Sequence, residues 1–146
     1  MAALYAVVMA GGRGERFWPL SADNLPKPFI KLLGSSSLVQ DTVTRIQPIV
    51  PLERVLISIG AAHLDIARQQ LPEIPAGNFL VEPIGRDTSA CIGFCALHIE
   101  QRDPEGMMLA LPADHFGCQP AGDRSIVFRS HPLGTRHIGG DSNRTA

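Results

Sequence analysis

Four short apolar runs constrain the fold of this chain more than any other feature of its sequence. They are residues 4–10 (LYAVVMA), 55–59 (VLISI), 79–81 (FLV) and 107–111 (MMLAL). Short runs that are apolar throughout, without alternation, are typical of strands buried on both faces of a parallel sheet. We therefore predict an α/β fold with a Rossmann-like, mostly parallel sheet and helices on both faces.

The stretches between these runs have the caps and the spacing of helices. The chain carries N-cap residues before two of the three stretches and prolines after the middle one. We predict helices from a cap at Ser36 or Ser37, over residues 63–71, and from a cap at Asp87 or Thr88 to about Glu100. Polar motifs follow three of the strands, and in parallel sheets ligands bind beyond the carboxyl ends of the strands.

Length and composition restrict the class of protein. The 146 residues suffice for one domain, and 45% hydrophobic with 18% charged residues indicates a globular chain. A net charge of −1 without a basic run argues against nucleic acid as a partner. The sequence shows neither a signal peptide nor a membrane-spanning stretch, so we expect a soluble, cytoplasmic protein with no membrane partner. The oligomeric state stays open.

The character of the chain changes after Phe116. Over residues 117–146, Gly, Ser, Arg and His are scattered without helical or strand periodicity, and residues 126–128 are the one short apolar patch. We predict a nucleotide-binding part at 1–116 and an irregular or disordered tail at 117–146. This leaves the strand at 107–111 on an unprotected edge of the sheet.

A glycine-rich turn, GGRGER, follows the first apolar run. Gly11, Gly12 and Gly14 allow positive φ angles and let backbone N–H groups approach a phosphate without an intervening Cβ. Arg13 and Arg16 add donors that suit phosphate oxygens. The pattern is neither a dinucleotide fingerprint nor a P-loop. The alternative is a glycine-rich turn without a ligand.

A second motif holds a lysine between two prolines. Pro26 and Pro28 restrict the backbone around Lys27, so its ammonium group is placed in a defined position. A fixed cation of this kind can stabilise charge on a phosphate. The alternative is a surface lysine in a proline-rich turn, although the chain has only one other lysine, Lys31.

Together the two motifs resemble the signature of nucleotidylyltransferases that activate sugar phosphates. The sequence FWPLS at residues 17–21 is more similar to the mannose-1-phosphate guanylyltransferase branch than to glucose thymidylyltransferases. The resemblance implies that the backbone of residues 11–14 cradles the phosphates of GTP. It also implies that Arg13, Arg16 and Lys27 neutralise charge while pyrophosphate leaves.

Residues 81–90 (VEPIGRDTSA) lie at a strand end and a helix start, a favourable place for a polar ligand. They resemble the family's Glu-Pro-x-x-Arg-Asn-Thr-Ala segment, which lies beside the nucleotide base. The resemblance implies nucleotide binding by Glu82, Arg86, Asp87 and Thr88. Asp87 replaces the usual Asn, so it can accept hydrogen bonds from guanine but cannot donate one. The alternative is a segment that only caps a helix.

Asp114 follows the fourth apolar run in the sequence LPADH. An acidic residue at the carboxyl end of a strand is a suitable Mg²⁺ ligand near a triphosphate. The sequence matches the family's Leu-Pro-x-Asp-His, in which the aspartate binds the metal. We therefore predict Mg²⁺ as the cofactor.

The resemblance implies an enzyme that makes GDP-mannose and pyrophosphate from GTP and mannose 1-phosphate. It covers a truncated domain, because the family's later segments that hold the sugar phosphate, including a Phe-x-Glu-Lys-Pro stretch, are absent. The alternative function is therefore a catalytically incompetent GTP-binding fragment.

Cys91, Cys95 and His98 share one face of the third predicted helix. They could hold zinc if Cys118 supplied a fourth ligand. Buried thiols that pack the helix against the sheet are the commoner arrangement, and we favour it.

Overall fold

The computed structural model describes residues 2–11, 25–31, 34–83, 88–113, 126–129 and 136–138. Within these ranges the chain forms a six-stranded sheet in the order β3-β2-β1-β4-β5-β6. The strands are β1 (Leu4–Met9), β2 (Val55–Gly60), β3 (Phe79–Glu82), β4 (Met107–Pro112), β5 (Ile126–Arg129) and β6 (Arg136–Ile138). The four predicted strands are thus confirmed, with ends that differ by a single residue.

Strands β1 to β4 are parallel, as the apolar runs predict. β1 lies in the centre, between β2 and β4, and β3 pairs with the outer edge of β2. Each of these strands is followed or preceded by a helix, so consecutive parallel strands are joined by crossovers. The Rossmann-like α/β fold is confirmed.

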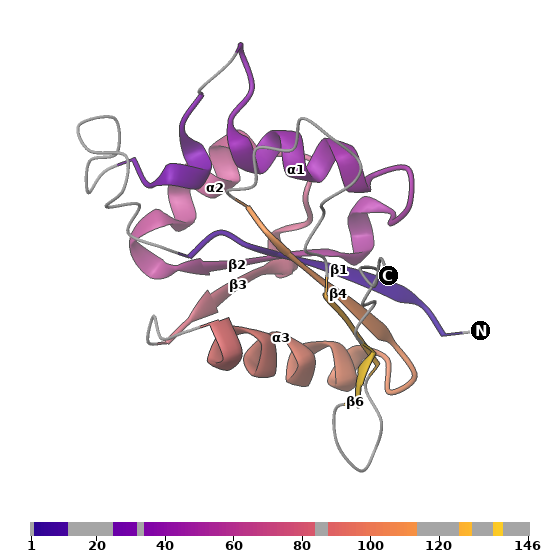
Figure 1. Ribbon diagram of the computed structural model, residues 1–146. Helices are drawn as coiled ribbons and strands as arrows, with labels where there is room; N and C mark the ends of the chain where they lie inside the picture. Colours follow the sequence, from indigo (N-terminus) through magenta and orange to yellow (C-terminus); the bar gives the residue numbers. More distant parts are fainter. Residues whose placement is uncertain are drawn as a thin grey trace, which may run out of the picture.

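The three predicted helices are present and cover both faces of the sheet. They are α1 (Leu38–Ile46), α2 (Leu64–Gln70) and α3 (Thr88–Arg102). Figure 1 shows α1 and α2 on one face of the sheet and α3 on the other. Among the described residues, no helix has both the length and the apolar character that crossing a membrane requires.

The start of α1 distinguishes between the two predicted caps. The Ser37 hydroxyl accepts a hydrogen bond from the Gln40 N–H at 3.4 Å, and the Gln40 side chain accepts from the Ser37 N–H at 2.8 Å. This reciprocal capping box satisfies two backbone donors that a helix start leaves unpaired. Ser37 is therefore the cap, and Ser36 precedes it.

The core is divided by the sheet into two layers. Alternate residues of β1 and β2 face α1 and α2, among them Val8 and Ile57, which are fully buried there. The residues between them, Val7 and Leu56, face α3. Strands buried on both sides explain why the apolar runs show no alternation in sequence.

Strands β5 and β6 correct the expectation of an unprotected edge at β4. Residues 126–129 pair antiparallel with β4, and residues 136–138 pair antiparallel with β5. β4 is therefore an interior strand, and the predicted unprotected edge at 107–111 is wrong. A short strand next to an open edge gains backbone hydrogen bonds without needing a long periodic pattern. The apolar patch at 126–128 was the one signal in the sequence for this pairing.

Asn78, in the turn before β3, connects three backbone segments. Its side chain is only 5% exposed, and its Nδ2 group donates to the carbonyls of Glu53 and Val55 at 3.0 Å each. Its Oδ1 accepts from the Arg102 guanidinium at 2.9 Å. The side chain thus ties the end of α3 to the start of β2 and β3.

We expect Asn78→Ala to lower the free energy of unfolding by about 2–3 kcal/mol, because it leaves buried carbonyls without donors. Urea denaturation followed by circular dichroism measures this change. The control is Gln47→Ala at an exposed position at the end of α1, with an expected change below about 0.5 kcal/mol. Equal changes in both variants would contradict the role assigned to Asn78.

Candidate functional site

The carboxyl ends of the parallel strands lie together at one edge of the sheet. Met9 pairs in register with Ser58 of β2 and with Pro112 of β4, and Gly60 pairs with Glu82 of β3. The backbone continues this alignment beyond the strands, because the Ala10 N–H donates to the Ser58 carbonyl at 2.9 Å. The loops that carry the polar motifs therefore leave the sheet at the same edge.

The structure describes four of the predicted site residues: Gly11, Lys27, Glu82 and Thr88. The others lie outside the described residues, namely Gly12, Arg13, Gly14, Arg16, Arg86, Asp87 and Asp114. Their assignments remain predictions. Asp114 directly follows Ala113, whose N–H donates to the carbonyl of Met9 at 3.1 Å.

Gly11 and Glu82 come together at this edge. A Cβ placed on Gly11 would lie 3.4 Å from Oε1 of Glu82, so the backbone after β1 runs close to the carboxylate at the end of β3. Gly11 does not have a positive φ angle; among the described glycines only Gly34 does. A Cβ at this distance would be in ordinary van der Waals contact with the carboxylate, so neither the backbone angle nor the available space requires glycine at position 11.

Glu82 is held by a side chain that the sequence did not single out. Ser58, fully buried in β2, donates a hydrogen bond from Oγ to Oε1 of Glu82 at 2.5 Å. The Cys91 thiol of α3 in turn donates to the Ser58 Oγ at 3.2 Å. A serine within an apolar strand gives only a weak sequence signal, because its partner is 24 residues away and becomes a neighbour only in the folded sheet.

The lysine motif forms a rigid turn. Residues Lys27–Phe29 make a single 3₁₀ turn, η2, with Pro26 at the cap position. The Phe29 N–H donates to the Pro26 carbonyl at 2.9 Å, and the Ile30 N–H donates to the Lys27 carbonyl at 3.1 Å. Pro26 and Pro28 both belong to this turn, and their effect on the position of Lys27 stays a prediction.

Two glutamines hold the lysine turn against the helices. Nε2 of Gln70, at the end of α2, donates to the Phe29 carbonyl at 3.2 Å. Nε2 of Gln40 in α1 donates to the Gln70 carbonyl at 2.8 Å. Phe29 itself is 1% exposed and belongs to the core layer under α1 and α2. The turn is thus anchored at Phe29, two residues after the half-buried Lys27.

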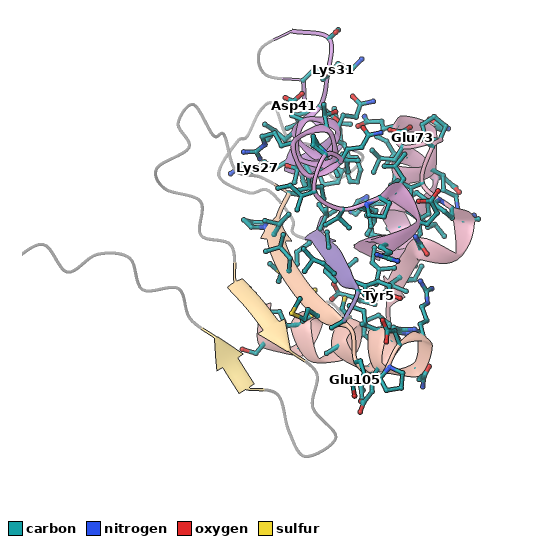
Figure 2. All side chains as sticks on the ribbon, turned by 90° about the vertical axis from the view of Figure 1, so that its right-hand side faces the viewer. Tyr5, Lys27, Lys31, Asp41, Glu73 and Glu105 are labelled. Carbon is teal, nitrogen blue, oxygen red and sulfur yellow. The ribbon has the colours of Figure 1, made fainter. Side chains whose placement is uncertain are left out.

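Lys27 and Glu82 belong to opposite faces of the sheet. Figure 2 shows the Lys27 side chain pointing out from the body of the molecule, on the side where β4 ends. The Glu82 carboxylate lies on the α3 face, because its partner Ser58 contacts Cys91 of that helix. The site therefore offers a cation on one side of the strand ends and a carboxylate on the other.

Thr88 is the first residue of α3 and is exposed. The first turn of a helix presents backbone N–H groups without intrahelical partners, and these groups favour anions or polar ligands. Asp87, the residue before it, lies outside the described residues, so the choice between Asp87 and Thr88 as cap stays a prediction.

The cysteine and histidine side chains of α3 do not converge. Cys91 and Cys95 are buried between α3 and the sheet, whereas the His98 ring packs edge-on against Phe94 with centroids 4.7 Å apart. No group of three or more metal-ligating side chains occurs in the part of the chain that the structure describes. The contacts favour the packing interpretation of these thiols.

The pKa values of the two thiols are shifted in opposite directions. The pKa of Cys91 is lowered, chiefly because the Cys95 thiol hydrogen-bonds to its sulfur, although burial acts in the opposite direction. The pKa of Cys95 is raised, because its proton is held in that bond and because burial disfavours a thiolate. The Cys91 thiol also contacts the Ser58 hydroxyl, to which it donates at 3.2 Å.

A parallel sheet covered by helices on both faces places this chain in the α/β class, in which ligands bind beyond the carboxyl ends of the strands. The family model described as nucleotidyl transferase matches residues 5–127, and the chain belongs to this family. Within the family, the chain is similar to mannose-1-phosphate guanylyltransferases.

Two relatives illustrate this similarity. Mannose-1-phosphate guanylyltransferase 2 of Escherichia coli O157:H7 is 39% identical over 118 residues, which are 78% of this chain and 24% of the relative. Mannose-1-phosphate guanylyltransferase RfbM of Salmonella typhimurium is 40% identical over 115 residues, 75% of this chain and 23% of the relative. The chain thus spans about a quarter of the length of the curated relatives it matches.

Solved structures show the same fold. A protein from Thermus thermophilus, described as a mannose-1-phosphate geranyltransferase, superposes with a TM-score of 0.69 at 40% identity and covers 77% of this chain and 32% of its own. A glucose-1-phosphate thymidylyltransferase from Bacillus anthracis superposes with a TM-score of 0.58 at 16% identity, over 77% of this chain and 44% of its own. The second similarity supports the fold alone.

Proposed function

We propose that this chain binds GTP at the carboxyl edge of its parallel sheet, as part of an enzyme that transfers GMP to mannose 1-phosphate. The products are GDP-mannose and pyrophosphate. The observation that carries the proposal is the meeting of Gly11 and Glu82 at the aligned strand ends. The backbone after β1 accommodates phosphates there, and the end of β3 with the start of α3 accommodates the base.

The proposed reaction is an in-line displacement. A phosphate oxygen of the sugar phosphate attacks the α-phosphorus of GTP, and pyrophosphate leaves without a covalent enzyme intermediate. Lys27, on its anchored turn, and Arg13 and Arg16 on the glycine loop stabilise the charge that develops on the phosphates. Most of the catalysis then comes from fixed positions and charges.

Mg²⁺ is part of the proposal. The carboxylate of Asp114 is a hard oxygen donor of the type Mg²⁺ prefers, and it follows β4 closely in sequence. Met9 and Ala113 join the backbones of β1 and β4 just before this position, so the residue preceding the proposed ligand is next to the strand that leads into the glycine loop. When bound, Mg²⁺ would supply charge neutralisation at the triphosphate.

We expect GTP with Mg²⁺ to protect the backbone amides of residues 4–16 from hydrogen exchange, because donors of the glycine loop close on phosphate. Mass spectrometry of peptides with and without nucleotide measures this protection. Peptides from η3 (Leu52–Arg54), before the amino end of β2, serve as the internal control and should not change. Unchanged exchange over 4–16 at saturating GTP would mean that the glycine loop is only a turn.

A second measurement distinguishes the transferase activity from the alternative function, a GTP-binding fragment without catalytic competence. Release of pyrophosphate from GTP and mannose 1-phosphate with Mg²⁺ reports the transfer itself. Protection of residues 4–16 without release of pyrophosphate by the 146-residue chain would support the alternative. Release by the purified chain would support the transferase activity in this chain.

A further inference from the structure

We propose that Ser58 is a positioning residue for base recognition, acting through the carboxylate of Glu82. This inference rests on the proposed GTP site and extends it to a residue in the core of β2. Its basis is a series of hydrogen bonds that runs from Cys91 of α3, along the face of the sheet that α3 covers, to Glu82 at the edge where the site lies.

The direction of this series of hydrogen bonds follows from its donors. A hydroxyl has a single proton, and the Ser58 proton is committed to Glu82 at 2.5 Å. The Ser58 oxygen accepts the Cys91 S–H at 3.2 Å, which occupies a lone pair of the hydroxyl. Hydrogen bonds in such a chain polarise one another, so the donor that reaches Glu82 is strengthened.

The hydrogen bond from Ser58 restricts the rotation of a flexible side chain. Glu82 is half-buried, and its carboxylate accepts the Ser58 hydroxyl proton. A glutamate that is fixed before the ligand arrives does not lose its rotamer freedom on binding. Ser58 is itself fully buried in a paired strand, so the position it imposes on the carboxylate is well defined.

The chemistry of the carboxylate specifies the class of ligand. Carboxylate oxygens only accept hydrogen bonds, and a carboxylate can accept several at once. Oε1 is engaged by Ser58, which leaves Oε2 as the natural acceptor for a ligand donor. A guanine base offers adjacent donors, its N1–H and its 2-amino group, whereas the N1 of adenine is an acceptor. A fixed carboxylate at this place therefore favours guanine.

The test compares GTP with inorganic tripolyphosphate, which has the phosphates without the base. Isothermal titration of the full chain with each ligand, in the presence of Mg²⁺, gives two dissociation constants. We expect Ser58→Ala to weaken GTP binding about tenfold, as for a lost hydrogen bond to a charged group, and to change tripolyphosphate binding by less than about twofold. A role in packing alone would change both affinities together.

A double-mutant comparison tests whether Ser58 acts through Glu82. In a Glu82→Gln background, Ser58→Ala should change GTP binding by less than about twofold, because the interaction it supports is already altered. Ser58→Cys, which fits the space but donates weakly, should lie between the wild type and Ser58→Ala. It also replaces Ser58→Ala in the comparison if that variant does not fold.

Thr42→Val is the matched control. Thr42 is also buried, and its hydroxyl donates to the Leu38 carbonyl at 2.9 Å in α1, on the other face of the sheet. This variant loses a buried hydroxyl but should keep the ratio of the GTP and tripolyphosphate affinities.

The outcomes separate the two proposals. A wild-type chain that binds GTP no more tightly than tripolyphosphate would overturn the base site of the proposed function, and Ser58 with it. A wild-type chain that prefers GTP, together with a Ser58→Ala variant that keeps the full preference, would overturn the role of Ser58 and leave the proposed function standing.

Discussion

Replacing Lys27 by alanine is expected to lower kcat about 100-fold or more, since removing one fixed donor of transition-state charge stabilisation commonly has this effect. KM for GTP should change by less than about threefold, because the contact forms chiefly in the transition state. The 3₁₀ turn with its backbone hydrogen bonds fixes the backbone that carries the lysine. The cation is therefore positioned in advance for the charge of the departing pyrophosphate.

The measurement uses a chimera with a longer relative, because the chain spans about a quarter of the length of the curated relatives it matches. Residues 1–116 replace the matching segment of the 40%-identical Thermus thermophilus protein, and pyrophosphate release is followed at varied GTP. Lys31→Ala is the matched control, because Lys31 is the other lysine of the chain and is exposed. Figure 2 shows it on the outer loop, away from Lys27. An unchanged kcat for Lys27→Ala, or an equal loss for both variants, would remove Lys27 from the mechanism.

The elements of the sheet could be predicted because their sequences obey one strong constraint. β1 and β2 are buried on both sides, so nearly every position is apolar or small, and the run ends where the strand ends. α1 was similarly predictable, since a cap at Ser37 and apolar residues at helical spacing point to the same helix. Local pattern and tertiary burial agree in these elements.

The strands after β4 could not be predicted, because no local sequence pattern indicates their pairing. β5 and β6 contain four and three residues, too few to show a period. They are positioned by backbone hydrogen bonds to a neighbouring strand, and such bonds place few demands on side chains. Sequence patterns therefore do not predict short strands such as β5 and β6, which pair with the edge of a sheet formed by earlier residues.

The candidate site also contains some residues that the sequence predicts and others that it does not. Motifs with unusual local chemistry, such as the lysine between two prolines at residues 26–28, were visible in the sequence. Ser58 was not, because its role depends on Glu82 and Cys91, which reach it only through strand register and helix packing. For Gly11, the approach of the backbone to a phosphate stays a prediction, and the structure shows no positive φ angle there.

Phe29→Ala is expected to cost about 3–5 kcal/mol of unfolding free energy, a large part of the stability of a domain of this size. The ring is 1% exposed and fills the layer between α1, α2 and the sheet, in one cluster with Leu111 at the end of β4. Its removal leaves a cavity that the flanking Pro28 cannot close, since the proline ring is fixed to the backbone. Urea denaturation measures the loss, and Phe29→Leu should cost about 1.5 kcal/mol or less.

The same substitution links the core to the site. Lys27 is two residues from this ring, so loss of the anchor should loosen the lysine turn more than the rest of the chain. Hydrogen exchange of residues 25–31 should then accelerate relative to residues 91–100 in α3. Phe94→Ala is the matched control, because its ring packs against the other core layer, beneath α3, and should accelerate α3 instead. If Phe29→Ala destabilises both segments equally, the ring supports the fold as a whole, and the position of Lys27 depends on the prolines and Gln70 rather than on the core.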